Sequence, residues 1–63
     1  MGYHIMDIGD LYEENRSDWL KCIVLVIGFY GDDPNLLWQW QSGRSCTGVV
    51  NLRYILDDFT LIT

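Results

Sequence analysis

The chain has 63 residues, of which 49% are hydrophobic and 14% aromatic, and nine acidic against four basic residues give it a net charge of −5. This length allows one domain with a small core, over residues 1–63, and the apolar content excludes a disordered segment. The four bases are scattered singly, which argues against binding to nucleic acid, because that binding needs clustered Lys and Arg.

The N-terminal part of the chain leaves two structures open. Apolar residues from Ile5 to Tyr12 alternate irregularly with acids, and no single period fits them. The pattern is compatible with a strand over Tyr3–Ile8, or with a short turn of helix over Leu11–Arg16 that Asp10 caps.

The longest predicted strand covers Trp19–Tyr30, which is rich in Val and Ile. Alternation places Cys22, Val24 and Val26 on one face and Ile23, Leu25 and Ile27 on the other, so both faces are apolar. Either residues 1–18 or a curled end of the sheet cover the second face, or it stays exposed and contacts a partner. The uncharged run from Cys22 to Gly31 is about half as long as a membrane-spanning helix, so we expect no membrane insertion.

A loop over Gly31–Asn35 and a second strand over Leu36–Gln41 are predicted next. Tyr-Gly-Asp-Asp at 30–33 matches a metal-binding tetrapeptide of RNA-dependent polymerases, but a chain of this length cannot supply the palm domain that two-metal chemistry needs. Gly, Asp, Pro and Asn are instead typical of a turn. In the second strand Trp38 and Trp40 share one large apolar face.

The C-terminal third predicts a turn at Ser42-Gly43, a third strand over Thr47–Ile55, a turn at Asp57-Asp58 and a last strand over Phe59–Ile62. Helical spacing of apolar residues offers an alternative to the third strand, but the pair Val49-Val50 favours a strand. The expected fold is all-β or β-dominated, with an α+β fold as an alternative. Its four or five strands would form a strongly bent antiparallel sheet or a small Tudor-like barrel.

Aromatic residues suggest one candidate site besides the exposed strand face. Trp38 and Trp40 fit a core position, since each ring can bury on the order of 200 Å². The alternative is an aromatic cage for a methylated amine, built from Tyr30, Trp38, Trp40 and Tyr54 beside Asp32 or Asp33.

No catalytic or metal-binding constellation is visible. His4 is the single histidine, and Cys22 and Cys46 are too few for a disulfide framework. We therefore expect a non-enzymatic protein without metal or cofactor. The lack of a basic, apolar leader before the acidic segment 7–18 predicts a cytoplasmic location.

One stretch resembles a known group of proteins. Trp19, Cys22, Val24 and Gly28 follow a Trp-x2-Cys-x-Val-x3-Gly pattern that is similar to a strand of small uncharacterised phage and prophage proteins. Those proteins often have Phe-Arg-Pro-Ile near the end, which the segment 52–55, Leu-Arg-Tyr-Ile, resembles with Tyr54 in place of Pro. The resemblance implies a small β-rich phage protein that acts in a bacterial cytoplasm and has no assigned enzyme activity.

These observations predict a phage-encoded protein that binds and inhibits a bacterial host protein. The predicted interaction surface combines the apolar strand face with two acidic pairs, and a cluster of these acids could imitate DNA phosphates. It consists of Ile23, Leu25, Ile27, Asp32, Asp33, Asp57 and Asp58. The alternatives are a homo-oligomeric structural protein, and a barrel that stacks single-stranded nucleic acid on Trp38 and Trp40.

Overall fold

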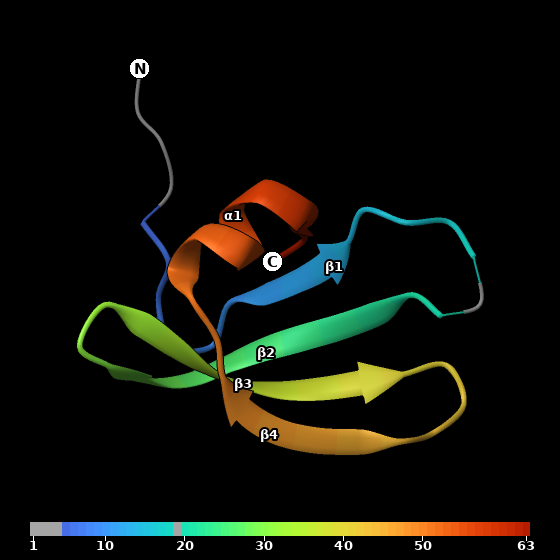
Figure 1. The fold of residues 1–63 in the computed structure, drawn as a ribbon, viewed down its shortest axis with the longest axis horizontal. Helices are drawn as coiled ribbons and strands as arrows, with labels where there is room; N and C mark the ends of the chain where they lie inside the picture. The colour runs from blue at the N-terminus through green and yellow to red at the C-terminus, as the bar shows by residue number, and fades with distance from the viewer. Residues whose placement is uncertain (1–4, 19) are drawn as a thin grey trace.

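A single antiparallel sheet and one short helix make up the computed structural model, which describes residues 5–18 and 20–63 (Figure 1). The elements are β1 (Leu11–Glu14), β2 (Cys22–Tyr30), β3 (Asp33–Trp40), β4 (Ser45–Val49), α1 (Leu52–Asp58) and β5 (Phe59–Leu61). The strand order is β4-β3-β2-β1-β5, so β4 and β5 are the two edges and the sheet is open. The β-dominated prediction is confirmed, and the bent open sheet is found in place of a closed barrel.

The N-terminal segment follows neither predicted alternative. Residues 5–10 form no strand or helix, because Asp10 accepts a hydrogen bond from the backbone nitrogen of Asp7 (2.8 Å) and closes a turn. Leu11–Glu14 is a strand instead of a helical turn, because it fits between β2 and β5 and bonds to both. Residues 3 and 4 of the predicted strand lie outside the described residues.

The β2–β3 hairpin has a shorter connection than the predicted five residues. Tyr30 pairs with Asp33, so only Gly31 and Asp32 form the turn. Gly31 has a φ of 61°, and no residue other than glycine has a positive φ among those described, which is the pattern of a type II′ turn. Pro34 has no N–H to donate. Its backbone groups point toward β4, where its carbonyl accepts a hydrogen bond from Val50, one residue after the end of β4, so no bond of the strand pair is lost.

The third predicted strand ends six residues early. β4 stops at Val49, and Asn51 begins α1 by accepting a hydrogen bond from the Arg53 backbone nitrogen (2.8 Å). The Asp33 carboxylate adds a second capping bond, because it accepts a hydrogen bond from the Leu52 backbone nitrogen (3.3 Å). The predictions of a strand through Ile55 and of a turn at Asp57-Asp58 are therefore wrong, because capping outweighs the β-propensity of the segment.

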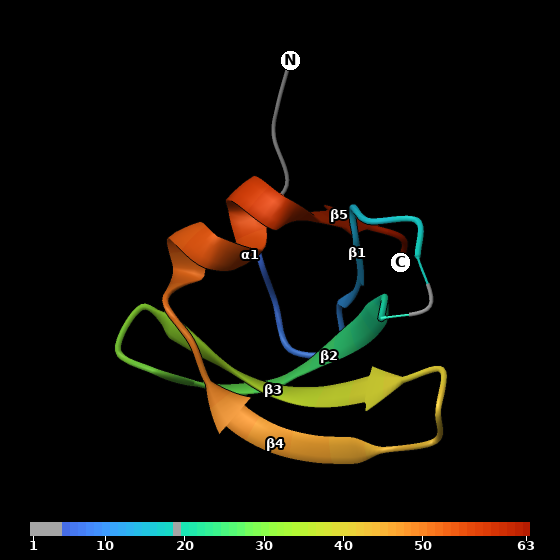
Figure 2. The ribbon, with the colours of Figure 1, turned by 45° about the vertical axis from the view of Figure 1, so that its right-hand side comes forward.

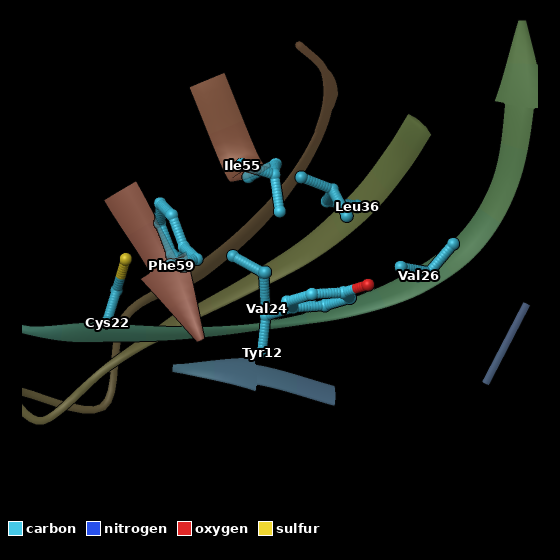
Figure 3. Close-up of a cluster of buried hydrophobic side chains, with 7 residues drawn as sticks. All are labelled: Tyr12, Cys22, Val24, Val26, Leu36, Ile55 and Phe59. Atoms are coloured by element: carbon cyan, nitrogen blue, oxygen red, sulfur yellow. The ribbon is translucent and has the colours of Figure 1, made fainter. Parts of the chain in front are cut away.

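The core lies between α1 and the face of the sheet that α1 covers, which we call the inner face (Figures 2 and 3). It contains residues from β1, β2, β3, α1 and β5: Tyr12, Cys22, Val24, Val26, Leu36, Ile55 and Phe59. The predicted alternation along β2 is confirmed, since its even-numbered residues from 22 to 26 are all buried. The opposite side of the sheet is called the outer face below.

Candidate functional site

A row of apolar side chains crosses the outer face of the sheet. The strand register places Leu25 of β2 between Leu11 of β1 and Leu37 of β3. Ile23 and Ile27 lie two residues to either side of Leu25 and are 39% and 40% exposed. We call these five residues (Leu11, Ile23, Leu25, Ile27 and Leu37) the outer-face patch. Leu11 and Leu37 were not predicted as site residues, because β1 was not recognised as a strand and Leu37 shares its face of the strand with the polar Gln39 and Gln41.

The described N-terminal residues do not cover this patch. Met6 packs against the core on the inner side of the sheet. The backbone of Gly9 and Asp10 runs alongside β2 and exchanges hydrogen bonds with Val26 (2.8 and 2.9 Å). Helix α1 lies on the other side of the sheet (Figure 2). Within residues 5–18 and 20–63, the patch therefore stays open to a partner.

The patch extends into a shallow groove of about 560 Å³. Leu11 and Ile23 supply apolar lining, and Gln39 adds a polar group. Glu13 and Lys21 form an ion pair within the same lining (2.5 Å). An apolar floor with a polar, ion-paired margin has the composition of a protein–protein contact. This ion pair is partly exposed and contributes little to stability.

The predicted acidic residues lie elsewhere and do not gather. Asp32 and Asp33 are at the β2–β3 turn, where Asp33 bonds to the start of α1. Asp57 and Asp58 end the helix, and Asp57 forms an i,i+4 ion pair with Arg53 (3.7 Å). The two pairs are therefore separated by the seven-residue helix, about 10 Å in length, and α1 lies on the face opposite to the patch.

Another group of acids surrounds Arg16. The Arg16 guanidinium donates two hydrogen bonds to the Asp18 carboxylate (2.9 Å each) and lies 3.8 Å from Glu14. These bonds hold the pKa of Asp18 below its usual range. The positive charge offsets part of the acidic surface here, so this region does not present a row of bare carboxylates.

Three of the four predicted aromatic residues come together, and Tyr30 does not. Trp38 is stacked on Trp40 (centroids 6.1 Å apart, planes at 16°) and on Tyr54 (6.4 Å, 27°). Phe59, which the sequence did not indicate, meets Trp38 and Tyr54 edge-on. Tyr30 is 69% exposed at the hairpin end.

The stack has the geometry of packed rings rather than of a cage. Near-parallel rings about 6 Å apart are in mutual contact and leave no space between them for a methylated ammonium group. The cation that does lie near the stack belongs to the chain itself, since the Arg44 guanidinium is 5.9 Å from the centre of the Trp40 ring.

The buried thiol of Cys22 should make the protein less stable in alkali. Burial, and then the negative charge of Glu14, raise the pKa of Cys22 from 9.0 to about 11. Between these values the unfolded thiol has lost its proton and the folded one keeps it, so the free energy of unfolding should fall from pH 9 to pH 11. Urea titrations at both pH values measure this loss.

Two variants identify the source of that loss. Cys22→Val removes the ionisable thiol but keeps an apolar side chain and should reduce the loss, whereas Cys46→Ser, on exposed β4, should leave it unchanged. Part of the loss of stability should remain in Cys22→Val, because burial also raises the pKa of Tyr12 and Tyr54. An undiminished loss in Cys22→Val would contradict the assignment to this thiol.

Comparisons with known proteins give no homologue from which a site could be transferred: the chain matches no family model, no curated protein and no solved structure. Within the described residues, no three His, Cys, Asp or Glu side chains are grouped so that they could hold a metal ion. The same part of the chain contains no helix with the length and hydropathy of a membrane span. The outer-face patch is therefore the candidate site that the structure itself defines.

Proposed function

We propose that the protein is a non-catalytic binding protein that docks on a partner protein through its outer-face patch. The supporting observation is that half-buried apolar residues of three neighbouring strands, Leu11, Leu25 and Leu37, form one continuous row that no described segment covers. Contiguous exposed apolar surface on a small protein is typical of an interface. Its side chains stand on paired strands, so little backbone conformational entropy is lost when they bind.

A bacterial host protein is the partner that we propose, with inhibition by steric occlusion as the effect. This part of the proposal rests on the resemblance of the segment from Trp19 to Gly28 to strands of phage proteins. Occlusion requires only a stable fold and a matching surface. It places no demand on catalytic groups.

Apolar docking is favoured over imitation of DNA. A phosphate mimic needs a dense array of carboxylates, but the acidic pairs lie at opposite ends of α1, and Glu14 and Asp18 are in contact with Arg16. Binding through the patch should accordingly be insensitive to salt, because screening acts on charges and not on apolar burial.

Replacing Leu25 by Asp should abolish binding to the partner. Leu25 is at the centre of the patch, and docking would bury the new carboxylate without a partner. We expect affinity to fall by at least about 30-fold, equivalent to 2 kcal/mol. Tagged protein is used to capture partners from bacterial lysate, and the captured protein is then purified and its dissociation constant measured for each variant.

The matched control is Leu56→Asp. Leu56 is exposed on α1, on the other side of the molecule, so this variant carries the same new charge and should bind like the wild type. Circular dichroism verifies that both variants are folded. Equal affinity of Leu25→Asp and wild type, or capture that disappears in high salt, would rule out docking through the patch.

A further inference from the structure

Strand β4 is an edge of the sheet that carries no protection against further pairing. Its five residues, Ser45–Val49, include no charge and no proline, and four of them are exposed. In Figures 1 and 2 no described segment lies beyond β4. Proteins usually protect such an edge with Lys, Pro or a bulge, because its free backbone groups can bind another strand. The other edge, β5, has three residues.

The hydrogen bonds to β3 show which backbone groups of β4 are free. Trp40 donates to the Arg44 carbonyl (3.0 Å), and Val50 donates to the Pro34 carbonyl (3.2 Å). Bonding alternates along an antiparallel pair, so Cys46 and Gly48, which lie between these ends, also point their groups toward β3. Ser45, Thr47 and Val49 therefore point their N–H and C=O groups away from the sheet. Within the described residues, these groups have no partner.

We propose that β4 pairs with β4 of a second copy of this chain, antiparallel about a two-fold axis at Thr47. In this register Thr47 lies opposite Thr47 of the second copy, and Ser45 lies opposite Val49. All outward groups of both strands are then bonded, and the two sheets continue into one. The contact is self-complementary, as a two-fold interface requires.

The distribution of charge supports a second copy as the occupant. Each chain carries a net charge of −5, so two copies repel wherever their acids meet. The acids of β1 are three strand spacings from β4, about 14 Å, which exceeds the screening length of about 8 Å at physiological salt.

The one charged residue next to β4 in the chain is basic. Arg44 precedes Ser45, and the acidic turn residues Asp32 and Asp33 lie beyond the opposite end of the strand, where Val49 pairs with Asn35 of β3. Antiparallel pairing brings Arg44 of each copy to the end of the strand near the acidic turn of the other copy. The two copies are therefore electrostatically complementary along this edge.

This pairing is independent of the proposed docking. It uses the backbone of β4 and leaves the outer-face patch of both copies open, on the same side of the joined sheet. A dimer would thus present two patches to a partner.

Sedimentation equilibrium and amide hydrogen exchange test the pairing on the full chain. We expect the mass to change from that of one chain to that of two between about 10 µM and 1 mM. Over the same range the amides of Ser45, Thr47 and Val49 should become protected. Those of Cys46 and Gly48 should be protected at both concentrations, because they bond to β3.

Two variants at the proposed axis separate edge pairing from other contacts. Thr47→Pro removes an outward donor without removing a bond to β3, and Thr47→Lys places two like charges together at the axis. Both should remain at the mass of one chain at about 1 mM, whereas Thr47→Val, which keeps the donor and the β-branched shape, should pair like the wild type. A wild type that stays monomeric at about 1 mM would overturn the inference. A dimer that dissociates in Leu25→Asp but persists in Thr47→Pro would overturn it too, because the copies would then meet through the outer-face patch.

Discussion

Replacing Leu36 by Ala should lower the free energy of unfolding by about 3 kcal/mol, which is enough to unfold much of a domain this small. Leu36 is fully buried on the inner face of β3 and belongs to the same core cluster as Val24 and Ile55 (Figure 3). The truncation removes buried methyl groups and leaves a cavity between sheet and helix. Urea denaturation followed by circular dichroism measures the change.

The neighbouring residue provides the control. Leu37 lies on the outer face, only half-buried, and Leu37→Ala should cost less than about 1 kcal/mol. If the two variants lost equal stability, the assignment of the faces would be wrong, and with it the position of the outer-face patch. This pair therefore tests the geometry on which the proposed function depends.

Replacing Trp38 by Ala should have the second largest effect, a loss of about 2–4 kcal/mol in the free energy of unfolding. The Trp38 ring contacts Trp40 and Tyr54 face to face and Phe59 edge-on, and so joins β3 to α1 and β5. Thermal and urea unfolding of the variant measure the loss. Near-ultraviolet circular dichroism should lose the signal of the stacked rings.

Tyr30→Ala is the matched control, because Tyr30 is an exposed aromatic residue at the hairpin end. It should change stability by less than about 0.5 kcal/mol. A loss below about 1 kcal/mol in Trp38→Ala would show that the ring does not hold the fold together. The cage hypothesis for Trp38, Trp40 and Tyr54 would then regain support.

The sequence predicts best where hydrophobic alternation extends over many residues. From Cys22 to Ile27 of β2 the period of two separates Val24 from Ile23, but both sets are apolar, so the sequence sorts these residues onto two faces without showing which face is buried. The structure buries the face of Val24 and breaks the regular register between Val26 and Gly28. In β3 the same rule places Leu36 and Trp38 together. The two-residue period predicts which side chains share a face in these strands, because one face is buried and a shift of the strand by one residue would expose it.

Prediction fails where partners distant in the sequence decide the structure. β1 has four residues, too few to define a period, and it is a strand because β2 and β5 lie on either side of it. The segment after Val49 has the β-propensity of a strand, but Asn51 and Asp33 together satisfy the first backbone donors of a helix. The sequence suggested one surface that joins Asp32 and Asp33 to Asp57 and Asp58, but helix α1 lies between the two pairs and holds them apart.

The position of β1 between β2 and β5 determines how the domain holds together. The Thr60 hydroxyl bonds to the Asn15 side chain, 45 residues away in the sequence, and Leu11 bonds to the carbonyl of Thr63. The strands β2, β3 and β4 are joined by short turns, but alone they would leave Val24 and Leu36 uncovered. Ordering the β1–β5 contact costs loop-closure entropy, and burial of Tyr12, Ile55 and Phe59 helps to offset this cost. We therefore expect that neither half of the chain is stable by itself and that the domain unfolds in one cooperative transition.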